Sequence, residues 1–180
     1  MTALLLLAAC HPPAAPDGPR FLHELSGDFW ASPLPGEHRR HPDGTVDLEA
    51  FPGQDADIVR RLVRLMDGVE TDFARSAAVY LPVDRTLVGA PAPDPGATLA
   101  VDAVVGLVDV DPRSDERGRR FPVIVQAVDG DGRFDPEHAL ALVPVQGVPL
   151  RPDTTYAAYA RRGLVDGFGD PAGPDDALAA

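Results

Sequence analysis

The stretch PVIVQAVDGDG (residues 122–132) decides how we interpret the fold of this chain. A run of apolar residues ends at Asp129-Gly-Asp-Gly132, which is a strong turn signal. A second apolar run follows at residues 139–145. The order strand, acidic turn, strand predicts β-structure in this half of the chain.

Short apolar runs of the same kind occur on both sides of this stretch, at residues 77–83, 104–110 and 154–160. The chain has 20 prolines and 17 glycines, which favour turns over long helices. Short strands at this spacing predict a mainly β fold of the sandwich type. The alternating residues 45–48 come directly after a turn signal at residues 41–44 and predict one more short strand.

One amphipathic helix is predicted near residues 55–67, inside an otherwise irregular lead segment (residues 21–75). Its apolar residues fall at three- and four-residue spacing on one face: Ile58, Val59, Leu62, Leu65 and Met66. Asp55 and Asp57 stand at its start, and three arginines follow toward its end. Gly68 is the expected left-handed residue that stops it.

The first ten residues differ in character from the rest. An apolar run ends at Leu7-Ala8-Ala9-Cys10, and the Pro-rich residues 11–20 follow. The run is too short to span a bilayer, so we interpret residues 1–10 as a signal peptide. The motif Leu7-Ala8-Ala9-Cys10 resembles the lipobox of bacterial lipoproteins. This resemblance implies that the Cys10 thiol is acylated and that residues 11–20 are an extended tether. Because no Lys or Arg precedes the run, we expect the true start to lie upstream.

Composition limits the classes of function. The 180 residues suffice for one domain with its own core, and a single cysteine cannot form an intramolecular disulfide. The formal net charge of −12 argues against nucleic acid and against an anionic lipid surface as partner. No segment after Cys10 is long and apolar enough to cross a membrane.

Residues 65–71 and 77–84 share a pattern with a known class of secreted enzyme. The helix ends in Leu-Met-Asp-Gly, and a strand ending near Asp84 follows. Together with residues 33–37 and 43–48, they resemble the N-terminal domain of bacterial virulence-factor-type extracellular lipases. In that family an α/β-hydrolase domain follows, and we expect none in this chain.

A second pattern lies near the C-terminus. Residues 142–144, 149–156 and 164–171 are similar to the ending of SbsA-type bacterial Ig-like domains. The resemblance implies a non-catalytic Ig-like β-sandwich over residues 76–171, followed by a tail at residues 172–180. Leu150 and Tyr156 are expected to face the core of that sandwich.

No catalytic residue is expected from the sequence. None of the serines lies in the Gly-x-Ser-x-Gly context of a hydrolase nucleophile; they are Ser26, Ser32, Ser76 and Ser114. Cys10 belongs to the lipobox-like motif, which argues against a cysteine nucleophile.

Calcium is the cofactor for which the sequence offers a candidate site. Asp129, Asp131 and Asp135 supply carboxylates at alternate positions, as in part of a calcium loop. Arg133 stands where a further oxygen ligand belongs, so we favour a plain acidic turn over a metal site.

Three other groups have a structural interpretation and a functional one. Pro42 and two adjacent arginines favour surface histidines over a zinc site at His38 and His41. Neighbouring arginines favour a solvated, internally neutralised loop for the acidic group Asp109, Asp111, Asp115 and Glu116. Packing onto the domain is favoured over an exposed ligand platform for the aromatic pair Phe29 and Trp30.

These observations lead to two hypotheses from different classes. The first is a non-catalytic cell-envelope lipoprotein that contacts the lipid bilayer through acylated Cys10. Its Ig-like domain would be structural or would bind an unknown envelope protein or glycan. The second is the N-terminal accessory domain of an exported lipase or esterase. Because His11, not Asp, follows Cys10, the resemblance to lipoproteins implies anchoring at the outer membrane.

Overall fold

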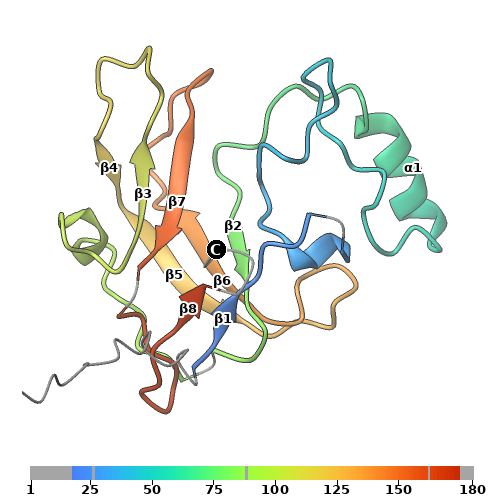
Figure 1. Cartoon of the computed structure of the whole chain (residues 1–180). Helices are drawn as coiled ribbons and strands as arrows, with labels where there is room; N and C mark the ends of the chain where they lie inside the picture. Colours follow the sequence, from blue (N-terminus) through green and yellow to red (C-terminus); the bar gives the residue numbers. More distant parts are fainter. Residues whose placement is uncertain (1–17, 26, 88, 162, 175–180) are drawn as a thin grey trace, which may run out of the picture.

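The fold is mainly β with one α-helix (Figure 1). The computed structural model describes residues 18–25, 27–87, 89–161 and 163–174. One antiparallel sheet has the strand order β2 (Val79–Pro82), β6 (Ala139–Pro144), β5 (Val123–Val128). The other has the order β4 (Arg120–Phe121), β3 (Val105–Asp109), β7 (Tyr156–Ala160). The remaining elements are β1 (Arg20–Phe21), β8 (Gly173–Pro174), α1 (Asp57–Met66) and two short 3-10 helices, η1 (Phe29–Ala31) and η2 (Ala97–Leu99).

The stretch that opened the sequence analysis forms β5, and the apolar run after the acidic turn forms β6. The two strands pair along their whole length, from Val123 opposite Pro144 to Val128 opposite Ala139. Val123 and Val125 are buried while Ile124 between them is exposed, as the two-residue period of a strand requires. This confirms the predicted strands, and β2, β3 and β7 lie within the other predicted runs.

Pro122 is the point at which the chain passes from one sheet to the other. Phe121 ends β4, which pairs with β3, whereas Val123 begins β5, which pairs with β6. Proline has no N–H to donate, so Pro122 takes part only through its carbonyl, which accepts the Val145 N–H at 3.0 Å on the side of β6. The Val123 N–H begins β5 with a hydrogen bond to the Thr98 hydroxyl in η2, at 3.2 Å.

Both sheets and their connecting loops contribute to one hydrophobic core. Its buried members include Val125 and Leu142 from one sheet and Leu107 and Phe121 from the other. Leu150 is buried in this core, and Tyr156 packs against it, as the sequence predicted. Removing this apolar surface from water provides the main stabilisation of the fold.

The strand predicted at residues 45–48 does not form. Val46 makes only one isolated antiparallel bridge, with Arg40. The reason is the tight turn between them: Gly44 has φ +90°, and the Gly44 N–H donates to the His41 carbonyl. Beyond the turn, the Val46 N–H donates to the Glu70 carbonyl and the Val46 carbonyl accepts the Gly68 N–H, so this segment is tied to the chain after α1 and not to a second strand.

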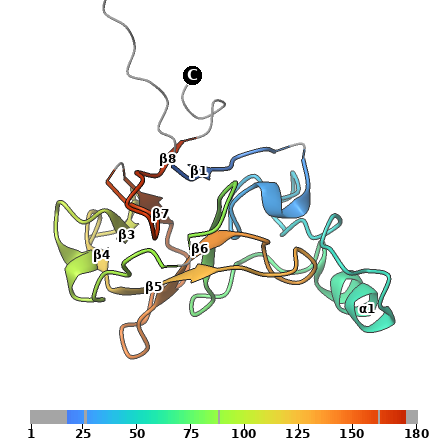
Figure 2. The same cartoon turned by 90° about the horizontal axis from the view of Figure 1, so that it is seen from below.

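Helix α1 lies inside the predicted range, and Gly68 adopts the left-handed conformation expected after its end, with φ +66°. Its packing is unlike that of an ordinary core helix, because Val63 is its one buried residue among those that the structure describes. Figures 1 and 2 both show α1 at the margin of the molecule, far from β3 and β4. No helix in the described ranges has the length and apolar character needed to cross a membrane.

The two ends of the described chain meet in a short parallel pair. Arg20 of β1, the last residue of the predicted tether, lies opposite Gly173 of β8 in the predicted tail. Gly18 approaches the Pro171 carbonyl so closely that a Cβ at this position would lie 2.2 Å from its oxygen. Asp84 fixes the pair to the end of β2, because its carboxylate accepts the Arg20 N–H at 2.8 Å.

Candidate ligand-binding pocket

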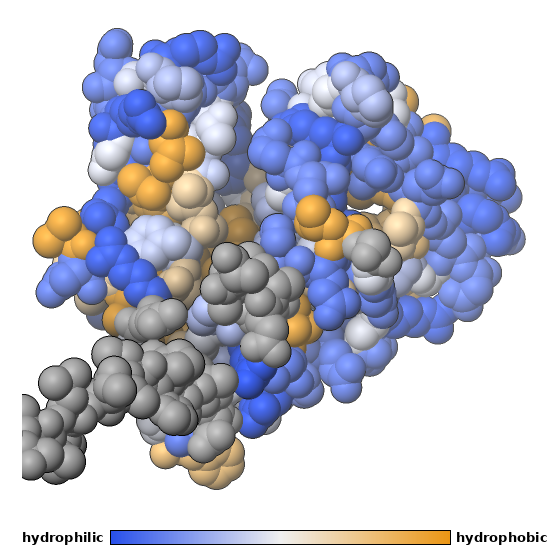
Figure 3. All heavy atoms as spheres, in the orientation of Figure 1, coloured by the Kyte–Doolittle hydropathy of each residue, from blue (hydrophilic) through white to orange (hydrophobic). Residues whose placement is uncertain are grey.

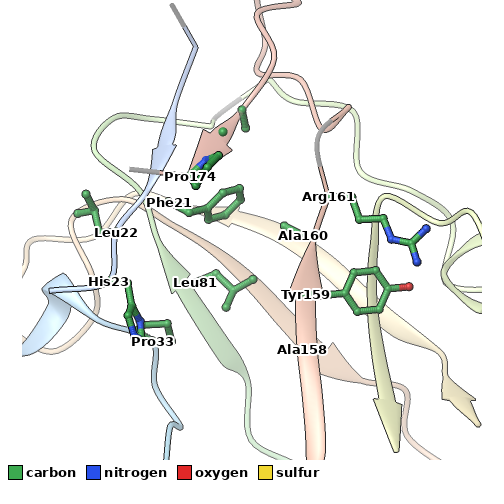
Figure 4. Close-up of a pocket in the computed structure, with 12 residues that line it drawn as sticks. Phe21, Leu22, His23, Pro33, Leu81, Ala158, Tyr159, Ala160, Arg161 and Pro174 are labelled. Atoms are coloured by element: carbon green, nitrogen blue, oxygen red, sulfur yellow. The ribbon is translucent and has the colours of Figure 1, made fainter. Parts of the chain in front are cut away.

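A pocket of about 370 Å³ lies between β2 and β7, beside the β1–β8 pair (Figure 4). Most of its lining is apolar; the residues are Phe21, Leu22, His23, Pro33, Leu81, Ala158, Tyr159, Ala160, Arg161, Ala172, Gly173 and Pro174. Figure 3 shows hydrophobic surface in the hollow between these parts of the molecule. Its mostly apolar lining suits a small apolar group.

The pocket exists because two edge strands leave a gap that small side chains do not fill. β2 and β7 are each the last strand of their sheet. Ala158 and Ala160 of β7 point toward the core, and Phe21 and Leu81 lie opposite them (Figure 4). Two alanines at these positions leave space that larger side chains would occupy.

The polar groups of β7 are turned away from the apolar interior. In Figure 4 the Tyr159 ring and the Arg161 guanidinium point away from Phe21. The guanidinium groups of Arg120 and Arg161 lie 5.7 and 5.2 Å from the Tyr159 ring centre, and Arg120 also hydrogen-bonds its hydroxyl. The ring lies over Gly106 of β3, where a Cβ would be 2.6 Å from its hydroxyl oxygen. The interior of the pocket therefore suits an apolar group better than a charged one.

One wall of the pocket borders three polar residues whose proximity was not predicted from the sequence: His23, Ser32 and His38. His23 lies edge-on to His38, with ring centres 5.7 Å apart. The His38 Nε2 atom is 3.0 Å from the Ser32 hydroxyl. Burial, followed by nearby Arg39 and His23, lowers the pKa of His38, which favours the neutral imidazole.

Ser32 and His38 have the spacing of a nucleophile and its general base, but the surroundings indicate a structural role. Ser32 is only 4% exposed, so a substrate has no access to it. Its hydroxyl accepts a hydrogen bond from the guanidinium of buried Arg39, at 2.8 Å. No carboxylate in the described residues orients His38. Ser32 and His38 therefore help to satisfy the hydrogen-bonding groups of the buried Arg39 guanidinium.

Phe29 and Trp30 are buried. This contradicts the interpretation of the pair as an exposed ligand platform and confirms the favoured prediction that both rings pack onto the domain. The Phe29 ring lies 5.0 Å from Trp30 and 5.1 Å from Phe51, both edge-on. The Arg39 guanidinium lies 3.9 Å above the Phe29 ring. These contacts attach the lead segment to β2, where Tyr80 meets Trp30 at 5.9 Å.

The two histidines considered for zinc point to different partners. His38 faces Ser32, whereas His41 Nε2 lies 3.4 Å from an Asp67 carboxylate oxygen. His41, Asp47 and Asp67 form the one group of three metal-type residues in the described ranges whose ligand atoms lie within 4.8 Å of one another. The Asp67 carboxylate also accepts the Leu48 N–H at 2.7 Å, so it already has a structural role as a backbone hydrogen-bond acceptor.

The three aspartates considered for calcium do not converge on one point. Asp129 turns toward His138 and Thr86, with hydrogen bonds of 3.0 and 2.6 Å. These contacts lower its pKa, the Thr86 hydroxyl most strongly. Asp131 accepts the Arg133 N–H at 2.8 Å, as a turn-forming aspartate does. Asp135 accepts the Asp131 N–H at 3.4 Å, so the geometry is that of a self-contained acidic turn.

In the acidic group at the end of β3 and in the loop after it, neighbouring arginines pair with Asp111 and Glu116 as expected, but the expectation of solvation is wrong for two members. Asp109 and Asp111 are 1% and 2% exposed. Asp109 accepts hydrogen bonds from the Ser114 hydroxyl and, at 3.0 Å, from the Asp111 N–H. The Arg113 side chain and N–H, with smaller help from the Thr155 N–H, lower the pKa of Asp111 to about 2. The carboxylates are buried because they close the loop that returns to β4.

The lipobox-like motif lies outside the described residues. This holds for Leu7, Ala8, Ala9 and the proposed lipidation site Cys10 alike. Acylation of Cys10 therefore stays a prediction from the sequence.

Comparisons with known proteins give no match, whether against protein-family models, curated proteins or solved structures. The functional argument therefore depends on the residues and on the geometry described above.

Proposed function

We propose that this protein is a cell-envelope lipoprotein, anchored through acylated Cys10, whose Ig-like domain binds an apolar group and is not catalytic. The observation that carries the binding role is the apolar pocket between the edge strands β2 and β7. An exposed apolar side chain of an envelope protein, or the apolar part of a lipid or glycolipid, has suitable chemistry for it.

Two features support the Ig-like part of this proposal. Two antiparallel sheets share one core, as in a sandwich. In addition, the Tyr156 hydroxyl accepts the N–H of Arg151, five residues upstream. This contact is similar to the tyrosine corner of Ig domains, in which a tyrosine hydroxyl bonds the backbone a few residues upstream.

Pocket binding is tested with a fluorescent apolar probe, N-phenyl-1-naphthylamine, and the full chain carrying Cys10→Ser. We expect saturable binding, weakened about tenfold by Ala158→Leu, because the added atoms fill the pocket. Ala157→Leu is the matched control, since Ala157 is the neighbouring residue on β7 but does not line the pocket. Equal binding by both variants would show that the probe binds elsewhere.

Anchoring is tested separately by mass spectrometry of the mature protein from the membrane fraction. The expected N-terminal residue is Cys10 carrying acyl chains, and Cys10→Ser should release the protein into the soluble fraction. An intact Met1, or an unacylated Cys10, contradicts the anchor without affecting the pocket.

A further inference from the structure

The candidate pocket runs along the edge of strand β7 and not over one of its faces (Figure 4). Four consecutive residues at the end of this strand, 158–161, line it. Side chains of consecutive strand residues point to opposite faces of a sheet, so a pocket that borders all four lies beside the backbone. β7 is the last strand of its sheet. A ligand in the pocket therefore meets backbone groups of β7 as well as apolar side chains.

The hydrogen bonds between β3 and β7 show which backbone groups face this edge. Arg161, directly after β7, donates its N–H to the carbonyl just before β3, at 2.7 Å. At the other end of the ladder the Val110 N–H donates to the Thr155 carbonyl at 3.0 Å. Bonded pairs alternate along an antiparallel ladder, so every second residue between these two ends also bonds to β3. Ala158 and Ala160 are the residues in between, and their N–H and C=O groups point to the open edge.

The facing edge strand, β2, is already paired along its edge. Tyr80 exchanges two backbone hydrogen bonds with Leu34, at 2.7 and 3.1 Å, and the Pro82 carbonyl accepts the Leu22 N–H at 2.9 Å. β7 has no such cover among the described residues. Its sequence, Tyr-Ala-Ala-Tyr-Ala, has no charge or proline, and its continuous register has no bulge that would block pairing. All five residues are half-buried, and unpaired backbone groups in such surroundings cost free energy.

We propose that the pocket binds an extended, apolar peptide segment of a partner protein, which adds to the edge of β7 as a further strand. This inference rests on the proposed binding role of the pocket and names the class of its ligand. An extended peptide offers donors and acceptors at alternate residues, about 6.8 Å apart, which matches the spacing of Ala158 and Ala160. An apolar side chain of the peptide would enter the space between these alanines and Phe21. An acyl chain would fill that space but leave the backbone groups of β7 unpaired.

The test is amide hydrogen exchange, measured by nuclear magnetic resonance on the full chain carrying Cys10→Ser. In the free protein we expect slow exchange at Ala157 and Tyr159, which bond to β3, and fast exchange at Ala158 and Ala160. The probe peptide is acetyl-Thr-Val-Thr-Val-Thr-amide. It should slow exchange at Ala158 and Ala160 by about tenfold or more and displace N-phenyl-1-naphthylamine from the pocket.

A matched pair of variants isolates the backbone donor. Ala160→Pro removes the outward N–H without breaking a bond between β3 and β7, as proline at a sheet edge allows. Ala160→Val keeps that N–H and adds a side chain of similar size. We expect Ala160→Pro to bind the peptide about fivefold more weakly than Ala160→Val does. Circular dichroism checks that both variants fold.

Two N-methylated forms of the peptide give a second comparison. Alternate N–H groups of an extended peptide point to opposite edges, and only one edge faces β7. One form is methylated on the valines and the other on the threonines. We expect one form to bind as the unmodified peptide does and the other to lose binding.

Several results would overturn the inference. Slow exchange at Ala158 and Ala160 in the free chain would show that the edge is already covered, by a second copy if light scattering shows a dimer. Equal binding by the two methylated forms, or by Ala160→Pro and Ala160→Val, would exclude strand addition. A peptide that leaves exchange unchanged, while n-decanol displaces the fluorescent probe, would assign the pocket to an acyl chain and leave the proposed function intact. Failure of the parent to bind N-phenyl-1-naphthylamine would contradict the proposed binding role as well.

Discussion

The phenol hydroxyl of Tyr156 accepts a hydrogen bond from the backbone N–H of Arg151, 2.8 Å away. The same ring packs edge-on against Phe121, with centres 5.3 Å apart, so one side chain joins the loop before β7 to the core. We expect Tyr156→Phe to lower the free energy of unfolding by about 1 kcal/mol, because the N–H loses its partner. Urea denaturation measures this. Tyr80→Phe is the control, since its hydroxyl has no hydrogen bond to a described residue, and equal losses would assign the effect to the ring environment alone.

Asp111 should make stability depend on pH in an acidic window. The pKa of its carboxyl is held at about 2 in the folded protein, mainly by Arg113, against an ordinary value of 3.8. As pH falls below the ordinary value, the unfolded chain takes up a proton that the folded chain does not, so stability falls until pH passes the folded pKa. Asp111→Asn should flatten the unfolding free energy across this window. Asp115→Asn, on an exposed residue of the same loop, should keep the parent slope; two identical profiles would contradict the role of Asp111.

Gly18→Ala should destabilise the β1–β8 pair. The new Cβ would lie 2.2 Å from the Pro171 carbonyl oxygen, and a backbone atom cannot move aside cheaply. We expect a loss of about 1–3 kcal/mol, with faster amide exchange at Gly173, whose N–H donates to the Pro19 carbonyl. Gly147→Ala is a useful comparison, because that site is open and only its φ of +92° opposes a side chain. It should leave exchange at Gly173 unchanged.

Ser32→Ala separates a structural serine from a catalytic one. The substitution removes the hydroxyl that accepts the Arg39 guanidinium, and Arg39 is itself buried. We expect a loss of about 1–3 kcal/mol in the free energy of unfolding, since a buried charged donor is left without that acceptor. Hydrolysis of p-nitrophenyl esters should be at the background rate in both the parent and the variant. A measurable parent activity that disappears in Ser32→Ala would contradict the non-catalytic proposal.

The sequence predicts the β-structure well because each strand has its own local signal. Residues 122–145 combine a two-residue apolar period with an acidic turn, and both properties act over a few residues. The incorrect prediction of a strand at residues 45–48 also comes from a signal that is purely local. The alternating pattern is present, but a strand also needs a partner over several residues, and among the described residues the segment forms a single isolated bridge, between Arg40 and Val46.

The candidate pocket and the bare face of α1 could not be predicted in this way. The pocket depends on Ala158 and Ala160 lying opposite Phe21, which is 137 positions before Ala158 in the chain. The helical pattern shows which side chains of α1 share a face, but the same pattern describes a face packed on a core and a face open to solvent. The buried carboxylates of Asp109 and Asp111 were missed because charge alone does not show which backbone N–H groups a carboxylate will meet.

The parallel pairing of β1 with β8 also determines how the domain responds to mechanical force. Arg20 lies opposite Gly173 and Phe21 opposite Pro174, with both strands running in the same direction. A pull on the N-terminal side of β1 and the C-terminal side of β8 therefore slides the strands past each other, so their contacts are loaded together. An antiparallel hairpin pulled at its open end would instead separate one pair at a time. Tension between the two ends of the described chain thus meets its first resistance in shear.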